Sequence, residues 1–215
     1  MNSVVSASAF VLVEVSDSDQ GLSICVETER LRITSIKDKF EPQLVELYGS
    51  SEVNALVGTG ATLTPDAVRA KIKRWFARFS AHNPLAGYVV TEKTTNTFVA
   101  DIVLKPIKDR SGPKIRFLPG IIEIGFLSTP TQMGKGYAKE YTNAVIHHLV
   151  PKLMELGYGV KESPDSSKIH RIEKIMATTS TLNVRCQSVL LKSMSFMGVK
   201  LRYGSDRHWY EHTYE

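Results

Sequence analysis

The hydrophobic pattern is clearest between residues 121 and 156, where the spacing of a strand gives way to the spacing of a helix. Residues 121–127 are almost continuously apolar, as in a buried strand, although the run contains the carboxylate of Glu123. From Tyr141 to Leu156, apolar side chains recur at helical spacing, which predicts an amphipathic helix that ends at Gly157. The pattern therefore predicts a buried strand, a glycine-containing turn and a long helix in succession.

The rest of the chain also reads as strands and helices. Strand patterns cover residues 22–26, 31–33, 87–91, 98–104, 171–178 and 209–214, and helix patterns cover residues 41–48, 64–79 and 183–194. Thr64 begins its helix with a capping hydroxyl followed by proline and aspartate, and polar residues at 94–96 turn two strands into a hairpin. Residues 105–120 and 159–168 are polar and are expected to be loops.

Length and composition indicate one globular domain. The chain has 215 residues, 42% of them hydrophobic, and residues 21–215 are expected to form a single domain after a loose arm or added edge strand at 1–20. The net charge of +5 allows an acidic ligand, but a solvated basic surface is the simpler interpretation. Cys25 and Cys186 are too few for a disulfide framework or a zinc site. No apolar run has membrane-spanning length, so we expect a cytoplasmic protein with no membrane partner.

The turn at residues 132–138 contains Gly134 and Gly136, directly before the helix pattern. Glycine lets the backbone approach a ligand closely, and the first N–H groups of a helix have no intrahelical partner. With the helix dipole behind them, these groups form a site for phosphate. The alternative is a tight connection that binds nothing, and the turn alone does not decide between the two.

Residues 126–138 as a whole resemble the acyl-CoA-binding motif of the GNAT N-acetyltransferase superfamily. Pro130, Gly136 and Ala138 lie at matching positions, whereas Met133 stands where arginine or glutamine is usual. Because that loop works mainly through backbone N–H groups, the departure at Met133 weakens the match without removing it.

Further segments carry the same resemblance. Residues 183–196 resemble the second GNAT motif, with Asn183 matching and Cys186 in the place of a serine. Residues 28–33 and 209–214 resemble the opening and closing strands of the branch that includes the ribosomal-protein N-terminal-alanine acetyltransferases. Together these matches span most of the chain in the right order.

The resemblance implies a fold and a reaction. The fold would be mixed α/β, with a mostly antiparallel sheet of about six or seven strands, a splayed central strand pair and helices on both faces. The reaction would move an acetyl group from acetyl-CoA to a primary amine, on a protein N-terminus or a small molecule, by direct attack in a ternary complex. No metal is implied, nucleic acid is not expected as a partner, and the chain would be a monomer or homodimer. The residues implied to contact acetyl-CoA are Phe126, Leu127, Ser128, Met133, Gly134, Lys135, Gly136, Tyr137, Ala138 and Asn183.

Two residues are candidates for proton transfer. Glu123 is the expected base, because a carboxylate in an apolar strand is costly unless it is paired or used; the alternative is a structural ion pair with a neighbouring Arg or Lys. Many relatives donate the last proton from a tyrosine, but here Leu190 takes that position. Cys186 could serve instead, although a packed small residue is the simpler interpretation. Glu140 is expected to be a solvated helix residue.

Two other functions remain open at this stage. A GNAT-like module that binds acyl-CoA without catalysis would explain Met133, Leu190 and Ser195, the last of which replaces a glycine of the second motif. A basic RNA-associated domain is a more distant alternative, and it would show strongly salt-dependent RNA binding.

Overall fold

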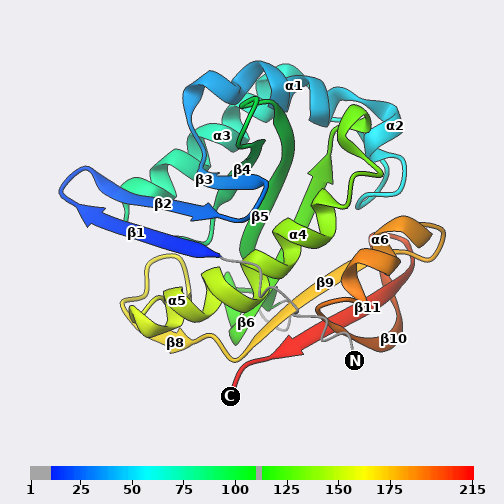
Figure 1. The fold of residues 1–215 in the computed structure, drawn as a ribbon. Coiled ribbons are helices and arrows are strands. Elements are labelled where there is room, and N and C mark those ends of the chain that lie inside the picture. Colours follow the sequence, from blue (N-terminus) through cyan, green and yellow to red (C-terminus); the bar gives the residue numbers. More distant parts are fainter. Residues whose placement is uncertain (1–10, 110–112) are drawn as a thin grey trace, which may run out of the picture.

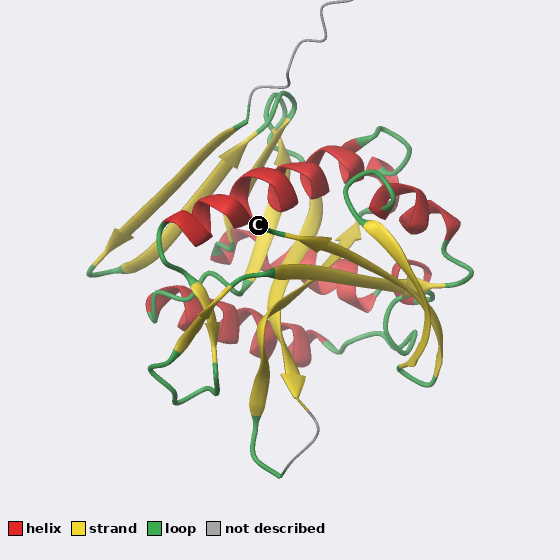
Figure 2. Ribbon diagram, turned by 90° about the horizontal axis from the view of Figure 1, so that it is seen from below, coloured by secondary structure: helices red, strands yellow, loops and turns green. Residues whose placement is uncertain are grey.

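The computed structural model describes residues 11–109 and 113–215, which form one large sheet with helices on both faces (Figure 1 and Figure 2). In spatial order, its nine strands are β1 (Leu12–Ser18), β2 (Gly21–Glu27), β3 (Leu31–Ser35), β4 (Gly87–Glu92), β5 (Phe98–Asp109), β6 (Arg116–Ser128), β9 (Lys174–Ser180), β11 (Ser205–Thr213) and β10 (Ser195–Arg202). A separate hairpin consists of β7 (Gly159–Lys161) and β8 (Ile169–Arg171). The predicted mixed, mostly antiparallel fold is confirmed, with more strands than the expected six or seven.

The sheet is split at its centre, between β6 and β9. These two strands are parallel and pair only over Ile121–Glu123 and Lys174–Met176. β6 nevertheless continues to Ser128 and β9 to Ser180, so the strands diverge beyond Glu123. This divergence is the expected splay of the central strand pair, and it opens a wedge in the middle of the sheet.

Helices cover the two faces in separate groups. α1 (Glu41–Gly49), α2 (Ser51–Asn54) and α3 (Pro65–Ser80) lie together at the top of Figure 1. The other group is one continuous helix, made of α4 (Tyr137–Ala144), the π-helical segment η3 (Val145–Leu149) and α5 (Val150–Glu155), with α6 (Val184–Leu190) beside α4. Short 3₁₀ turns are η1 (Asp38–Phe40) and η2 (Pro130–Gln132).

The local sequence explains where α3 begins and which face it buries. The hydroxyl of Thr64 accepts a hydrogen bond from the Ala67 N–H at 3.3 Å, and Pro65 occupies the first helical position. Its buried side chains are Val68, Ile72, Trp75 and Phe79, at helical spacing. This face packs into the apolar core that also contains the centres of β3 to β6.

The π-helical segment lies just before a proline in the last third of the long helix, and this proline explains it. Pro151 has no N–H to donate to a carbonyl in the preceding turn. The hydroxyl of Tyr214 donates to the Ile146 carbonyl at 2.9 Å, so the end of the chain supplies a hydrogen bond that the helix lacks there. The closing strand is thereby tied to the central helix.

The main error of the sequence prediction concerns residues 105–120. They were expected to be a loop, but β5 and β6 extend through this segment as a hairpin, with Lys108 opposite Phe117. The hairpin projects beyond the rest of the sheet in Figure 2. Lysine and arginine are tolerated there because a projecting ribbon exposes much of its surface to solvent. The polar composition suggested a loop although the backbone pairing persists.

Other differences are smaller. The expected helix at 183–194 ends at Leu190, and the edge strand β10 was not predicted as a strand. Part of the expected loop at 159–168 forms β7. Of the arm expected at 1–20, residues 1–10 lie outside the described residues, and β1 pairs with β2 at the sheet edge.

Candidate active site

A cavity of about 980 Å³ passes through the wedge between β6 and β9. Its middle is lined by residues 124–128 of β6 and 177–179 of β9. At one end, called here the loop end, the walls are Pro130, residues 132–134, residues 136–139 and α6. At the opposite end, called here the α2 end, the walls are Val53, residues 56–58, Lys105, Glu123, Tyr203 and Arg207. Two reactants that enter from opposite ends can therefore meet beside β6.

The loop end is shaped by two glycines in the left-handed region. Gly134 has φ of +79° and Gly136 has φ of +80°, and Gly136 is the N-cap of α4. An added Cβ at Gly136 would have only an ordinary contact with Arg30, at 3.5 Å, so the backbone angle and not crowding demands glycine. Among the residues that the structure describes, no side chain caps the start of α4. Its first N–H groups are therefore placed to bind an anion.

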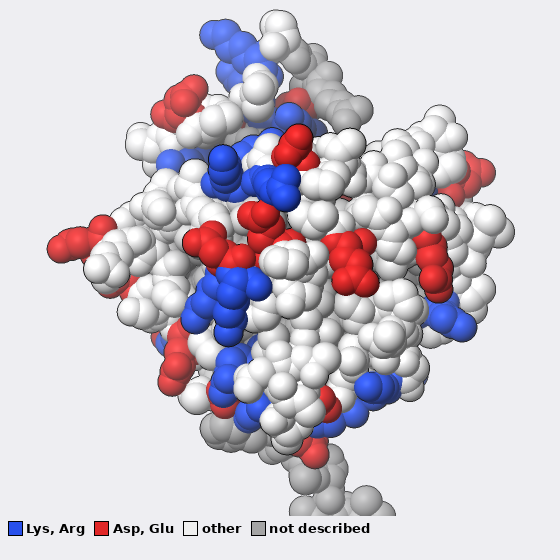
Figure 3. All heavy atoms as spheres, turned by 90° about the horizontal axis from the view of Figure 1, so that it is seen from above, with Lys and Arg blue, Asp and Glu red and all other residues white. Residues whose placement is uncertain are grey.

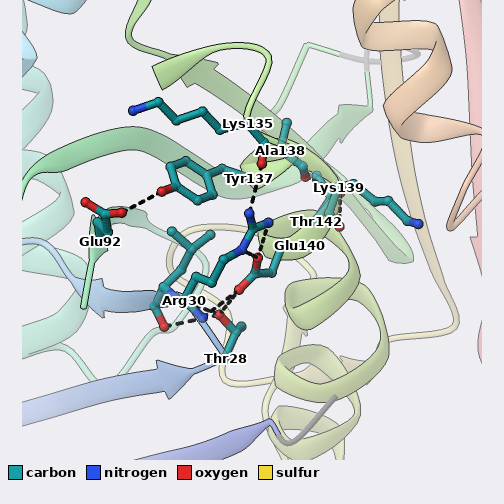
Figure 4. A network of polar contacts seen from close by, with 10 residues as sticks. Thr28, Arg30, Glu92, Lys135, Tyr137, Ala138, Lys139, Glu140 and Thr142 are labelled. Carbon is teal, nitrogen blue, oxygen red and sulfur yellow. Dashed lines mark hydrogen bonds and ion pairs between the residues drawn. The ribbon is translucent and has the colours of Figure 1, made fainter. Parts of the chain in front are cut away.

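Arg30 braces this loop from the side (Figure 4). Its guanidinium donates to the Lys135 carbonyl at 2.9 Å and to the Glu140 carboxylate at 2.7 Å, and it lies 4.7 Å from the centre of the Tyr137 ring. Glu140 also accepts from the Thr28 hydroxyl at 2.5 Å and from the Arg30 backbone N–H at 3.0 Å. The residues just before β3 therefore hold the loop and the first turn of α4 in place.

This network corrects the expectation for Glu140. Its side chain is only 17% exposed and makes an ion pair with Arg30, so it is not a solvated helix residue. On the opposite side, the hydroxyl of Tyr137 donates to Glu92 at 2.7 Å. The sequence concealed these contacts because Arg30 and Glu140 are 110 residues apart.

Two cations at the loop end were not singled out from the sequence. Lys139 and Arg185 both line the cavity and are exposed. Lys139 stands in the first turn of α4, and Arg185 stands on α6, which packs beside α4. Exposed cations beside a helix N-terminus suit a ligand with several phosphates. For Lys139, the sequence signal that could have indicated a phosphate site was a lysine in the first turn of a helix that begins at a glycine turn.

The second motif segment lies across the cavity from this loop. The side-chain oxygen of Asn183 accepts from the Cys186 N–H at 3.1 Å and so caps α6. Cys186 is hydrogen-bonded to the Thr179 side chain, and burial raises the pKa of its thiol. The thiol is therefore protonated at neutral pH and is able to donate a proton. Both Asn183 and Cys186 line the cavity.

Glu123 lies at the α2 end and is 6% exposed. Its Oε2 atom is 2.8 Å from an Arg202 nitrogen and 3.3 Å from the Lys105 ammonium. The ion pair considered as the alternative is thus present. Within the described residues both ion pairs use Oε2, so Oε1 is the oxygen that could face a water or an amine.

A second buried carboxylate, Asp101, escaped the sequence analysis. It is fully buried on β5, accepts a hydrogen bond from the Tyr48 hydroxyl, and burial raises its pKa to about 6. The ammonium of Lys71 lies 3.8 Å from the centre of the Tyr48 ring, and burial lowers its pKa to about 8. The sequence feature that could have revealed Asp101 is the one that revealed Glu123, namely a lone carboxylate in an apolar strand. Asp101 does not line the cavity among the described residues, so we regard it as structural.

Arg207 shapes the α2 end from β11. It is almost fully buried, and its guanidinium donates to the Gly58 carbonyl at 3.3 Å and to the Leu56 carbonyl at 3.5 Å. The segment after α2 is thus held against the closing hairpin, which places its carbonyls and apolar side chains at the cavity mouth. Nothing in the local sequence around Arg207 indicated this role.

Nearly all residues implied by the resemblance reach one cavity. Those that line it are Glu123, Phe126, Leu127, Ser128, Met133, Gly134, Gly136, Tyr137, Ala138, Asn183 and Cys186. Lys135 does not line it; its carbonyl faces Arg30 and its ammonium lies 2.8 Å from Gln132.

Two further observations bear on the kind of site. Among residues 11–109 and 113–215, no group of three or more His, Cys, Asp or Glu side chains is placed to hold a metal ion. None of the helices in those residues is long and apolar enough to cross a membrane.

Known structures share this fold. An acetyltransferase of the GNAT family from Bacillus anthracis superposes with a TM-score of 0.63 at 21% identity, covering 88% of this chain and 98% of the other. The ribosomal-protein-S5-alanine acetyltransferase from Vibrio fischeri gives 0.62 at 14% identity, covering 88% and 96%. RimL, a ribosomal L7/L12 alpha-N-protein acetyltransferase solved with coenzyme A, gives 0.62 at 11% identity, covering 93% and 98%. At identities this low, the superpositions show a common fold and no more than that.

Family membership rests on the sequence itself. A comparison with curated proteins finds none that matches the chain. The family described as the acetyltransferase (GNAT) domain, however, matches residues 30–193, which include the loop, the long helix and most of the second motif segment. Since this match covers well over half of the 215 residues, the chain belongs to the GNAT acetyltransferase family.

Proposed function

We propose that this protein is an acetyl-CoA-dependent N-acetyltransferase whose acceptor is a primary amine, either a protein N-terminus or a small molecule. The observation that carries the proposal is the single cavity that joins the loop end to the α2 end through the wedge. A thioester that enters at the loop end and an amine that enters at the α2 end would meet beside β6. Direct attack within a ternary complex follows from that arrangement.

The loop end supplies what coenzyme A requires. Its pyrophosphate would accept hydrogen bonds from backbone N–H groups of residues 134–138, with Lys139 and Arg185 neutralising further charge. The part of β6 from residues 124–128 does not pair with β9. Its backbone can therefore pair with the amide groups of the pantetheine arm, which would place the thioester in the wedge.

The chemistry then needs three groups. The amine must lose a proton to attack the thioester carbonyl, and Glu123 would accept that proton directly or through water. Backbone N–H groups near the end of β6 would stabilise the tetrahedral oxyanion. As the C–N bond forms and the C–S bond breaks, the departing thiolate would take a proton from the Cys186 thiol, and the Cys186 thiolate would be reprotonated from solvent.

The position of Cys186 can be tested chemically. One similar structure, the L7/L12 acetyltransferase, contains a disulfide between coenzyme A and one of its own cysteines. If Cys186 lies beside the coenzyme A sulfur, oxidised coenzyme A should form a mixed disulfide that mass spectrometry detects. Cys186→Ser should abolish the adduct, whereas Cys25→Ser, on β2, should leave it unchanged. An adduct that depends on Cys25 would contradict this geometry.

The main test is an acetyl-CoA thiol-release assay with peptides of varied N-termini, polyamines and small amines. Amine-dependent thiol release with a matching acetylated product would support the proposal. The competing function is a module that binds acyl-CoA without catalysis, which the ion pairs of Glu123 and the leucine at position 190 favour. That module would bind coenzyme A in calorimetry and release no thiol with any acceptor.

A further inference from the structure

A second cavity, of about 910 Å³, opens next to the α2 end. It shares Lys105, Glu123 and Tyr203 with the first cavity, so the two adjoin at Glu123. Its walls are mainly the projecting β5–β6 hairpin and the β10–β11 hairpin, together with Arg78 of α3 and Pro164. This second cavity, called here the acceptor groove, leads outward from the place where the amine would react.

The acceptor groove is rich in positive charge. Arg78, Lys105, Lys108 and Arg202 line it, and Glu123 is the one carboxylate among its described lining residues. One carboxylate cannot neutralise four cations. Phe117, Tyr203 and Trp209 form part of the walls, and apolar walls of this kind strengthen the field between charges. The groove would therefore attract an anion.

Arg202 retains hydrogen-bonding capacity after its ion pair with Glu123. Its Nη2 donates to Glu123 at 2.8 Å, but its Nη1 is buried and has no hydrogen-bond partner among the described residues. The guanidinium lies 4.9 Å from the centre of the Tyr203 ring and 6.0 Å from that of Trp209. A buried donor without a partner is costly, and a small movement of the Arg202 side chain toward the groove would let a ligand carboxylate relieve that cost.

These cations are not in position to bind the phosphates of coenzyme A. The helix N-terminus, Lys139 and Arg185 lie at the loop end, whereas the acceptor groove begins at Glu123, at the opposite end. On the face of the molecule in Figure 3, Lys and Arg are interspersed with Asp and Glu, so that face is not a broad nucleic-acid surface. The four cations of the groove thus lie on the acceptor side.

We propose that the acceptor is a peptide N-terminus followed within its first few residues by Asp or Glu. This inference rests on the proposed acetyl transfer and narrows its acceptor. The α-amine would reach Glu123, and the acidic side chains would lie in the acceptor groove against Lys105, Lys108 and Arg202. A groove of about 910 Å³ between two hairpins has room for several residues, which favours a peptide over a small amine.

The test uses peptides of equal length with the same first residue and with acidic, neutral or basic residues at the next four positions. We expect kcat/KM for the acidic set to exceed that for the basic set by about 10-fold or more, and this advantage to shrink as salt is added. Lys108→Glu should reduce the acidic-to-basic ratio several-fold. Lys114→Glu is the matched control, since Lys114 is also an exposed lysine on the hairpin but does not line the groove.

The possible outcomes distinguish the proposed acidic acceptor from the proposed acetyltransferase function. Thiol release with neutral or basic peptides equal to that with acidic ones, and unchanged by Lys108→Glu, would overturn the acidic acceptor and leave the acetyltransferase in place. Faster acetylation of free glutamate than of any acidic peptide would overturn the peptide assignment. Coenzyme A binding without thiol release from any amine would instead remove the proposed function itself. Unfolding curves of both variants check that they remain folded.

Discussion

The two ends of the central cavity are built in different ways. The loop end comes mostly from one continuous segment, residues 130–139, which Arg30 braces, and we propose that it binds through backbone N–H groups. The α2 end and the acceptor groove combine α2, the β5–β6 hairpin, the β10–β11 hairpin and Arg78. The loop end therefore suits a cosubstrate common to many enzymes, whereas the opposite end depends on side chains brought together by the fold. We expect variants at the two ends to affect different steps.

The largest effect is expected for Glu123→Gln, at the α2 end. This variant keeps the shape of the side chain but cannot accept a proton at neutral pH, so kcat should fall by about 100-fold or more. Affinity for acetyl-CoA, measured by calorimetry, should be nearly unchanged because the loop end is intact. Raising the pH should restore part of the rate, since more of the amine is then neutral.

The same variant separates the catalytic role of Glu123 from its structural alternative. If Glu123 only pairs with Arg202 and Lys105, the Gln variant should lose thermal stability and show no recovery of rate at higher pH. A stable variant with wild-type turnover on a confirmed acceptor would contradict the assignment as base.

The matching change at the loop end is Gly136→Asp. It places a carboxylate where a phosphate would bind and a Cβ on a backbone with φ of +80°. Coenzyme A affinity should fall by about 100-fold, or about 2.8 kcal/mol. Gly136→Ala carries the same backbone strain without the charge, so it should lose clearly less affinity. Equal coenzyme A affinity for wild type and Gly136→Asp would exclude this loop as the phosphate site.

Asp101 can be compared with Glu123, because both are buried carboxylates but only Glu123 lines the cavity. Its pKa in the folded state, about 6, is above the ordinary value of 3.8, so the folded state holds its proton more tightly than the unfolded state. The stability that this proton provides is complete below about pH 4 and is lost as the pH rises through about 6, at a cost of up to about 3 kcal/mol. Asp101→Asn should remove that loss.

The measurement for Asp101 is the difference in unfolding free energy between Asp101→Asn and wild type at pH 5 and pH 7. The difference should move in favour of the variant as the pH rises. Taking the difference removes the opposite trend of carboxylates such as Glu27 and Glu92, whose pKa values are lowered. A pH-independent difference would show that Asp101 does not titrate in this range.

The smallest effect is expected for the bracing of the loop. Arg30→Ala removes the hydrogen bond to the Lys135 carbonyl and the ion pair with Glu140. We expect coenzyme A affinity to fall by about 10-fold, near 1.4 kcal/mol, with the KM for the amine unchanged. Arg32→Ala is the control, because Arg32 pairs with Glu27 and does not contact the loop. An equal effect of both variants would indicate general destabilisation.

The sequence by itself determined the features that depend on neighbouring residues. The glycine turn before α4, the cap at Thr64 and the apolar stripe of the long helix are local properties, so pattern and motif located them correctly. The family resemblance added the mixed, mostly antiparallel sheet and the splay of its central strands, which periodicity alone does not contain.

Only the tertiary structure decided which distant side chains meet. Arg30 reaches Glu140, Arg207 holds the segment after α2, and Lys105 and Arg202 enclose Glu123, although each pair is separated by a long stretch of chain. Glu123 and Asp101 gave the same signal, a carboxylate in an apolar strand, yet one lines the cavity and the other is buried against Tyr48. Strand register and the packing of helices on the sheet set such encounters, and neither is encoded in residues that are adjacent in sequence.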